Sequence, residues 1–575
     1  MPFRPPVAEQ LFLLDHVVGM AELAAHPRFA EATPETVQAI VEGLADFAEG
    51  EFAPLNRIGD QEGARWSPDG VTLPAGFREA YRAYVEGGWG TLSGPVEQGG
   101  QGLPGILQAV ALDDLGSANL AFSLIAMLTP GAVESLVHHG SDELKATWLP
   151  KLVTGEWNGT MNLTEPQAGS DVGALKTRAE PRGDGSWSIT GTKIFITWGD
   201  HDLADNVVHL VLARTPDAPA GTRGISLFLV PKFRLDEDGR PTVPNDVRCV
   251  SIEHKLGINA SPTCVMSYGD GGDCVGWLIG PEHGGMRAMF TMMNNARLNV
   301  GLQGVSIAER AMQGAVDYAR DRVQSARAGA ASREPVTIID HPDVRRMLIR
   351  MKALTQGARA LTYYAYGQAD RATLGDEAAR ARLDLLTPLV KAYGTDVGVE
   401  VASLGVQIHG GMGFVEETGA AQHYRDARIT PIYEGTNGIQ AADLVGRKLG
   451  LEGGAVLDRL IADILGDAGP HQELRVLAAA CADVAAHLAK AGHDDRLAGS
   501  YPFLTMLSVA TAGWLMSRQL KAAETATGDP DFLAMKRAAA RFYLEQIVPE
   551  AVGLAAAATA PADLLYSVPE TAFAA

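Results

Sequence analysis

The sequence predicts a mainly helical α+β protein whose strands are gathered in one central domain. Apolar residues recur at helical spacing over about residues 6–149, and short β-rich runs separated by turns follow from about residue 158. Long amphipathic segments return after Gly284. Because strands and helices are segregated along the chain, the order does not favour a doubly wound dinucleotide-binding fold.

The length of 575 residues and the 46% hydrophobic content exceed what one hydrophobic core normally holds. The changes of pattern predict four domains in the order N-terminal helical domain, β-domain, helix bundle and appended Ala-rich helical domain. Their expected bounds are 1–157, 158–283, 284–450 and 451–575. No fixed-period repeat interrupts this order.

The composition narrows the classes of partner. The net charge of −21 opposes nonspecific attraction to nucleic acid or anionic lipid. No apolar run approaches the roughly 18 residues that cross a bilayer, so we expect no membrane span. The N-terminus lacks the long apolar core of a signal peptide, and the four cysteines lack CxxC spacing. We therefore expect a cytoplasmic protein with reduced thiols and no metal site.

Three short segments combine residues that suit a bound cofactor. Residues 161–171 (MNLTEPQAGSD) offer hydroxyls and backbone N–H groups, and residues 193–199 (KIFITWG) alternate like a strand. Residues 407–414 (QIHGGMGF) place glycines where a pyrophosphate could approach the backbone closely. Taken singly, each has an ordinary alternative: a capping turn, a sheet edge, or a helix C-cap followed by a loop.

The fourth segment contains a candidate general base. Glu434 stands between Tyr433 and Gly435, and the apolar pair at 431–432 precedes Tyr433. Apolar and aromatic neighbours raise the pKa of a carboxyl group, as a base working near neutral pH requires. The alternative is an ordinary surface-loop glutamate.

Together, the motifs TEPQAGSD, KIFITWG, QIHGGMGF and IYEGTNGIQ occur in an order and spacing that resemble the acyl-CoA dehydrogenases over roughly residues 40–450. The resemblance implies a helical domain, a β-barrel domain and a four-helix bundle enclosing FAD and an acyl chain. It also implies FAD-dependent α,β-dehydrogenation of an acyl-CoA thioester to a trans-2-enoyl-CoA. Glu434 would remove the α-proton, and the β-hydrogen would leave as hydride to flavin N5.

The resemblance also implies which other residues form the site. The residues expected at FAD are Met161, Leu163, Thr164, Ser170, Phe195, Thr197, Arg322, Gln407, Gly410, Gly411 and Thr436. Those expected at the substrate are Ser170, Asn294, Arg297, Tyr433 and Gly435. Asn294 stands where the family commonly has Asp, which keeps hydrogen bonding but removes a charge. Arg322 and Gln407 match positions that reach FAD of a neighbouring subunit, so we expect a homodimer or a dimer of dimers.

The N-terminal extension and the terminal helical domain resemble a branch that contains 3-methylmercaptopropionyl-CoA dehydrogenases. The resemblance therefore implies 3-methylthiopropanoyl-CoA as substrate, with a short- or medium-chain fatty acyl-CoA as the alternative, and an electron-transfer flavoprotein as acceptor. An acyl-CoA oxidase would share the same residues. A DNA-associated alkylation-response flavoprotein is disfavoured, because residues 451–575 hold nine Lys or Arg against fifteen Asp or Glu.

Overall fold

The computed structural model describes residues 3–575, with the side chain of Asn294 left out of the description. The chain divides into two units, each described by itself below: one is mainly residues 35–299, and the other combines residues 6–34 with 300–575. Helix α9 (Gly285–Asp321) contributes residues to both units. The expectation of a mainly helical α+β fold with one central group of strands is confirmed.

The first unit begins with helices and continues into the strands. Its helices are α3 (Pro34–Phe47), α4 (Leu55–Glu62), α5 (Phe77–Glu86), α6 (Gly105–Ala118), α7 (Leu120–His139) and α8 (Asp142–Thr154). Helix α7 starts where the Asn119 side chain accepts a hydrogen bond from Phe122 N, and α8 starts at Ser141, whose hydroxyl accepts from Leu144 N. The Asn119 cap separates α7 from α6, and the Ser141 cap separates α8 from α7. The helical pattern of the sequence is nearly continuous across these boundaries.

Helix α7 has a higher mean hydropathy than the sequence pattern suggested. Among the described residues it is the one helix with the length and composition of a membrane span, with a mean hydropathy of 1.7. However, 83% of that apolar window is buried inside the protein. Its apolar side chains therefore serve as core of this unit, as in the central helix of many globular domains.

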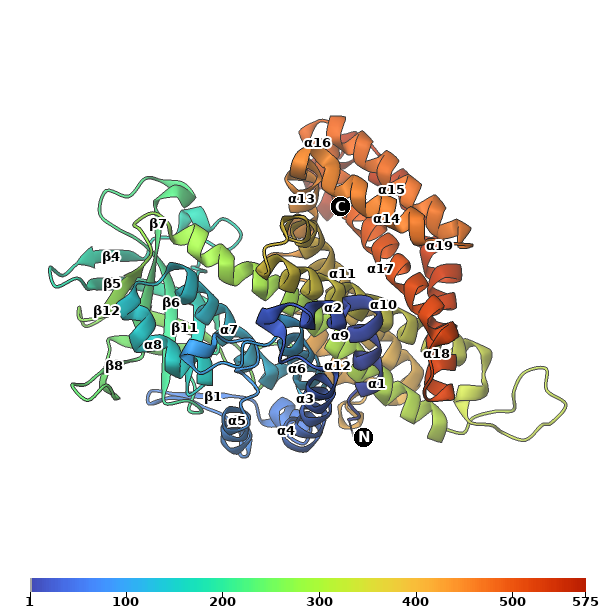
Figure 1. Cartoon of the computed structure of the whole chain (residues 1–575), viewed down its shortest axis with the longest axis horizontal. Helices are drawn as coiled ribbons and strands as arrows, with labels where there is room; N and C mark the ends of the chain where they lie inside the picture. The colour runs from blue at the N-terminus through green and yellow to red at the C-terminus, as the bar shows by residue number, and fades with distance from the viewer. Residues whose placement is uncertain (1–2) are drawn as a thin grey trace. The chain divides into compact units, whose positions relative to one another are not determined.

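One eight-stranded sheet forms the β-domain (Figure 1). Its strands are β3 (Trp157–Asn162), β4 (Arg178–Pro181), β5 (Trp187–Thr197), β6 (Asn206–Arg214), β7 (Ile225–Pro231), β10 (Val247–Ile252), β11 (Thr263–Tyr268) and β12 (Val275–Ile279). They pair in the order β10-β11-β5-β12-β7-β6-β3, with β4 against β5 and β6. All pairs are antiparallel except β3 with β6 and β4 with β6. Two small hairpins complete the unit: β1 (Arg65–Ser67) with β2 (Gly70–Thr72), and β8 (Phe233–Leu235) with β9 (Pro241–Pro244).

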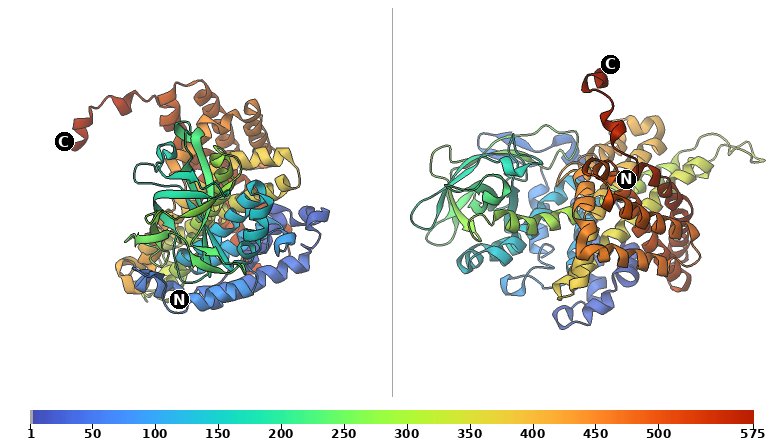
Figure 2. Two further views of the ribbon diagram at one scale, coloured as in Figure 1. Left: turned by 90° about the vertical axis from the view of Figure 1, so that its left-hand side faces the viewer. Right: turned by 90° about the horizontal axis from the view of Figure 1, so that it is seen from above.

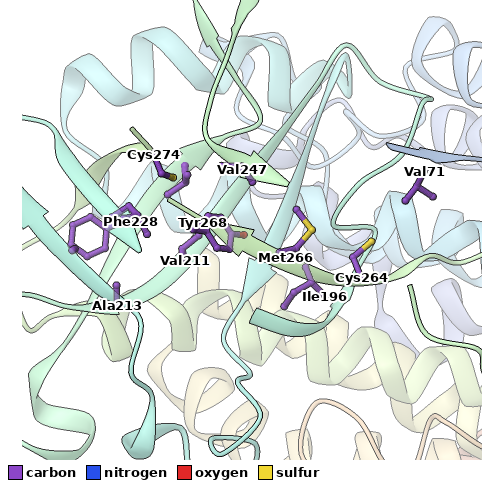
Figure 3. Close-up of a cluster of buried hydrophobic side chains, with 13 residues drawn as sticks. Val71, Ile196, Val211, Ala213, Phe228, Val247, Cys264, Met266, Tyr268 and Cys274 are labelled. Atoms are coloured by element: carbon purple, nitrogen blue, oxygen red, sulfur yellow. The ribbon is translucent and has the colours of Figure 1, made fainter. Parts of the chain in front are cut away.

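The core of the β-domain gathers side chains from several strands, as Figure 3 shows. Phe228 and Val211 come from neighbouring strands, and Cys264 and Met266 face inward from β11. All four cysteines are free thiols, as predicted, but Cys249 is only half-buried. The core therefore holds β5, the strand of the predicted KIFITWG segment, firmly against its neighbours.

The second unit is helical. Its main helices are α10 (Pro342–Thr373), α11 (Glu377–His409), α12 (Ala420–Ala427), α13 (Asn437–Gly446), α14 (Ala455–Asp467), α15 (Gln472–Lys490), α17 (Ser500–Thr525) and α18 (Pro530–Phe542). The unit also contains the shorter helices α16 (His493–Ala498), α19 (Val548–Val552), α20 (Ala555–Ala558) and α21 (Asp563–Tyr566). Helix α20 still contacts α15 and α17, and the C-terminal end of the chain then leads away from these helices, as Figure 2 shows.

The N-terminal residues belong to this helical unit. Helix α1 (Val7–Leu13) places Glu9 in the interior of this unit. There the Lys536 ammonium lies 2.9 Å from Glu9 Oε1, and Gln356 donates to the same carboxylate. Phe12 packs beside Leu533 of α18. A buried pair joining residues 527 positions apart is a contact that local sequence patterns do not reveal.

Candidate active site

The first two predicted cofactor segments lie side by side in the β-domain. The backbone N–H of Ile194 donates to Thr164 O at 2.9 Å, and the Lys193 ammonium donates to Leu163 O at 3.0 Å. Strand β5 thereby fixes the backbone of the loop that follows β3. The fold thus brings together two segments about 30 positions apart, both of which the sequence motifs predict to bind FAD.

A buried ion pair underlies this loop. Lys193 Nζ lies 2.8 Å from Glu165 Oε1, and neither side chain is more than 4% exposed. The carboxylate also accepts from the Thr177 hydroxyl at 2.6 Å and from the backbone of Lys176 at 2.7 Å. Burial by itself would raise the pKa of Glu165, but the Lys193 charge and these hydrogen bonds hold it at about 2. Burial lowers the pKa of Lys193 to about 8 despite the opposing effect of Glu165.

An irregularity in β5 turns an aromatic side chain outward. The pairing of β5 with β11 shifts register between Lys193 and Ile196, and Phe195 within that step has a positive φ of 58°. The Phe195 side chain is 58% exposed, which is unusual for a large apolar group. Thr197, two residues on, is half-buried. The bulge therefore leaves the Phe195 ring exposed on the residue after Ile194, whose backbone N–H bonds Thr164 O.

The remaining residues predicted in this loop differ in exposure. Met161 is buried at the end of β3, whereas Leu163 and Thr164 are half-buried. Ser170 is exposed. The loop is therefore apolar and buried near Met161 and solvent-exposed near the Ser170 hydroxyl. Such a gradient suits a flat heterocycle of which one part is buried and the other is accessible.

Glu434 lies in a tight turn of the helical unit. It has a φ of 54°, and Gly435 after it has a φ of 82°. Two consecutive left-handed residues are costly when one of them carries a side chain, and such strain gathers at functional sites. The turn is closed by Asn437 N, which donates to Pro431 O at 3.0 Å. The Thr436 hydroxyl then caps α13 by accepting from Ile439 N.

Tyr433 points its hydroxyl at α9. The phenol donates to Gln303 Oε1. Burial, together with the neighbouring Glu434 charge, raises the pKa of Tyr433 well above its ordinary value. The hydroxyl therefore stays protonated at working pH and fixes the residue before Glu434. The sequence alone does not reveal this role of Gln303, because a single glutamine on an amphipathic helix carries no local signal.

The residues predicted at the adenosine end of FAD lie at the ends of two helices. Arg322 follows the last residue of α9 and is exposed, and Gln407 lies near the end of α11. The rings of Tyr318 and His409 stack at 4.4 Å, which brings these two helix ends together. Gly410 ends α11 with a φ of 60°, and a Cβ built on it would meet nothing within 4 Å. This glycine step leaves open space beside exposed backbone.

The predicted pair on α9 is described only in part. Arg297 is buried, at 8% exposure, whereas the side chain of Asn294 lies outside the described part of the structure. Next to it, Asn295 donates to Glu134 of α7 at 3.1 Å. This contact holds the first half of α9 against α7 within the first unit.

Family comparisons cover nearly the whole chain. Models of the acyl-CoA dehydrogenase N-terminal, middle and C-terminal domains match residues 34–156, 160–270 and 283–449, and an acetyl-CoA dehydrogenase C-terminal-like model matches 470–569. The chain belongs to the acyl-CoA dehydrogenase family. It is therefore an FAD-dependent oxidoreductase with an additional C-terminal helical domain, as the sequence motifs predicted.

Individual relatives of this acyl-CoA dehydrogenase agree with the family models. A 3-methylmercaptopropionyl-CoA dehydrogenase of Ruegeria pomeroyi is 48% identical over 571 residues, covering 96% of this chain and 97% of the relative. A butyryl-CoA dehydrogenase of Syntrophomonas wolfei is 37% identical, with 91% of each chain covered. The structure of a Bacillus anthracis acyl-CoA dehydrogenase complexed with FAD superimposes with a TM-score of 0.74 at 24% identity, covering 94% of this chain and 91% of that one.

The side chains described above fit the cofactor of this dehydrogenase family. The exposed Phe195 ring and the ordered Leu163–Thr164 backbone offer an apolar surface and polar groups to a flavin ring. Arg322 supplies an exposed cation and Gly410 an open backbone, as a pyrophosphate requires. Among the described residues there is no cluster of His, Cys, Asp or Glu with the arrangement of a metal site.

Proposed function

We propose that this acyl-CoA dehydrogenase oxidises 3-methylthiopropanoyl-CoA to the corresponding trans-2-enoyl-CoA, with Glu434 as the base. The observation that carries the choice of substrate is the 48% identity over 571 residues to a protein named for that substrate. The observation that favours Glu434 is its strained backbone in a turn fastened on both sides. A relative named butyryl-CoA dehydrogenase, 37% identical, supports a short-chain fatty acyl-CoA as the second candidate.

The chemistry requires a base held close to an acidified C–H bond. The α-proton of a thioester becomes removable only if charge on the thioester oxygen is stabilised as it forms. Glu434 takes this proton on its carboxylate, and the positive φ of its backbone fixes the direction of the side chain. The hydrogen bond from Tyr433 to Gln303 keeps the turn from rotating. When bound, FAD accepts the β-hydrogen as a hydride.

The other predicted residues divide into three groups in this proposal. Met161, Leu163, Thr164, Phe195, Thr197 and Thr436 contact the flavin, while Arg322, Gln407, Gly410 and Gly411 hold the phosphates and adenosine. Ser170, Asn294, Arg297, Tyr433 and Gly435 contact the substrate. The exposure of Arg322 and Gln407 at paired helix ends supports their reaching a cofactor outside their own fold. We therefore also propose a homodimer or a dimer of dimers.

Reduced FAD would have to pass its electrons to a partner protein before the next turnover. We propose an electron-transfer flavoprotein as that acceptor and the cytoplasm as the place of reaction. The DNA-associated alternative is not supported, because the C-terminal domain holds nine Lys or Arg against fifteen Asp or Glu. An oxidase would be recognised by peroxide formed when substrate is added under air.

An anaerobic titration of the purified holoenzyme tests the substrate. The panel pairs 3-methylthiopropanoyl-CoA with pentanoyl-CoA, which replaces sulfur by CH₂ at nearly the same length, and adds butanoyl- and octanoyl-CoA. Bleaching of the flavin absorbance reports reduction. We expect the sulfur compound to reduce the flavin several-fold faster than pentanoyl-CoA, which is less than the roughly 10- to 200-fold that a whole methylene group in a pocket provides. Equal values would favour the short-chain alternative, and no bleaching by any thioester would contradict dehydrogenation.

A further inference from the structure

The helix that carries the Glu434 turn packs against the appended C-terminal domain. Helix α13 begins at Asn437, three residues after Glu434, and contacts α17 of that domain. Helix α17 also contacts α11, on which α13 rests. All of these elements belong to the same unit of the chain. The residue that closes the turn therefore lies where the two domains meet.

Asn437 is the centre of a polar cluster. It is 4% exposed, and its side-chain oxygen accepts from the Lys391 ammonium at 2.8 Å. Its amide nitrogen donates to Asp396 Oδ1 at 2.8 Å and to the Thr395 hydroxyl at 3.0 Å. Its backbone N–H makes the 3.0 Å bond to Pro431 O that closes the Glu434 turn. Fixing the Asn437 side chain thus fixes one end of the turn.

A tyrosine hydroxyl of the C-terminal domain contacts this cluster. Tyr501, at the start of α17, donates to Asp396 Oδ2 at 2.7 Å. Asp396 on α11 therefore uses one oxygen for Asn437 and the other for Tyr501. The path from the domain to the turn is continuous: Tyr501 to Asp396, Asp396 to Asn437, and Asn437 to the backbone at Pro431.

This path is important because the conformation of the Glu434 turn depends on contacts with other residues. Glu434 has a left-handed backbone that is unfavourable for a residue with a side chain, so the surrounding contacts must maintain it. A second contact supports the turn more weakly, since Gln440 donates to Glu434 O at 3.4 Å. Burial raises the pKa of Asp396, against the hydrogen bonds from Tyr501 and Asn437 and the charges of Lys391 and Arg428. The hydrogen bonds from Tyr501 and Asn437 both favour the charged form of this carboxylate.

We propose that the appended C-terminal domain positions the catalytic base, with Tyr501 and Asp396 acting as positioning residues that hold Asn437 and, through it, the Glu434 turn. This inference rests on the proposed role of Glu434. It assigns the additional domain a function in the reaction of the same chain. Neither Tyr501 nor Asp396 contacts the reacting atoms in this account.

Tyr501→Phe in the full-length FAD-loaded enzyme tests the proposal. It removes only the hydroxyl, leaving the ring and its packing. At saturating acyl-CoA, we expect the rate constant of flavin reduction to fall roughly 5- to 10-fold, less than the full effect of a hydrogen bond to a charged group, because Tyr501 acts on the turn only through other residues. We expect FAD content and KM to change less than twofold. A purely structural role would instead lower thermal stability without this split between kcat and KM.

Tyr543→Phe is the matched control. The Tyr543 hydroxyl also reaches α11, where it bonds the Tyr393 hydroxyl at 2.5 Å, but Tyr393 makes no contact in the path to Asn437. The control also removes one interdomain hydrogen bond made by a tyrosine hydroxyl, here to a neutral partner. We expect it to reduce flavin at the wild-type rate. If both variants slow reduction equally, the Tyr501 path has no special role and the proposal is wrong.

Asp396→Asn gives a second measurement that does not depend on Tyr501. The amide keeps the shape but cannot accept from both neighbours. We expect it to slow reduction as well, and the double variant with Tyr501→Phe to be no slower than the slower single variant, because both interrupt one path. Multiplicative effects, or wild-type rates in both variants, would overturn the proposal. If no thioester reduces the wild-type enzyme, the proposed function fails instead, and the two failures are thereby distinguished.

Discussion

Lys193 Nζ lies 2.8 Å from Glu165 Oε1 in the interior of the β-domain, and the same ammonium bonds the carbonyl of Leu163. One buried pair thus joins the loop after β3 to strand β5. The two segments that it joins are those we assign to the flavin. The pair is therefore expected to act on stability and on cofactor binding together.

Breaking the pair should be costly. Glu165→Gln leaves the Lys193 ammonium buried without a counter-charge, and removing one partner of a buried pair costs about 3–5 kcal/mol. We expect a lower urea midpoint and a lower FAD content after gel filtration. The double variant Glu165→Gln with Lys193→Met should recover part of the loss, because no buried charge remains unpaired. The exposed pair Arg182–Asp273 offers a control, where Asp273→Asn should cost less than about 1 kcal/mol.

The pH dependence of stability should contain a contribution from His209. Burial lowers its pKa to about 3 from the ordinary 6.5, with a smaller effect of the Lys232 charge. Between these values the unfolded chain binds a proton that the folded protein does not, so stability rises with pH across this window. We expect stability to fall by roughly 1.4 kcal/mol per group for each pH unit below about 6.5.

The His209 contribution can be isolated with one variant. His209→Gln keeps a polar side chain that can reach Thr160, whose hydroxyl lies 2.8 Å from His209 Nδ1. Urea midpoints of both proteins are compared at pH 7.0 and 5.0. The variant should lose less stability on acidification than the wild type. An unchanged difference between the two pH values would show that His209 is not buried in the neutral form.

The contact between α9 and α11 depends on glycines. A Cβ on Gly304 would lie 2.0 Å from Gly394 O, too close for the helices to remain in place. Gly304 follows Gln303, which bonds Tyr433, so Gly304→Ala should lower both thermal stability and the rate of flavin reduction. Gly314 in the same helix has nothing within 4 Å of its Cβ position. Gly314→Ala should therefore stabilise by about 0.5–1 kcal/mol and leave the rate unchanged. Equal behaviour of the two variants would contradict close helix contact at Gly304.

Much of the fold followed from sequence patterns. Periods of 3.6 and 2 separate the helices from the strands, and the motifs around Thr164 and Glu434 led to the family. The contacts that hold these motifs could not be predicted in the same way. Lys193 lies 28 residues from Glu165, and Tyr501 lies 105 residues from Asp396. Each looks like an ordinary polar residue in its own segment, and only the packed structure brings the partners together.

The N-terminus illustrates the same limit at longer range. Glu9 lies in an amphipathic helix that the pattern predicts well, yet its partner Lys536 is 527 residues away. Helix α7 shows the converse. Its sequence holds no uninterrupted apolar run long enough to predict a span, yet its apolar window has a mean hydropathy of 1.7, which burial in the core explains.

The most direct test of the central claim is the rate of flavin reduction in Glu434→Gln. Anaerobic stopped-flow mixing with 3-methylthiopropanoyl-CoA measures this rate in the holoenzyme, and the exposed Glu417→Gln serves as control. We expect Glu434→Gln to keep FAD and bind the thioester, yet to reduce flavin roughly 10²- to 10⁴-fold more slowly, the range for loss of a general base. Wild-type rates in Glu434→Gln would show that another residue removes the α-proton.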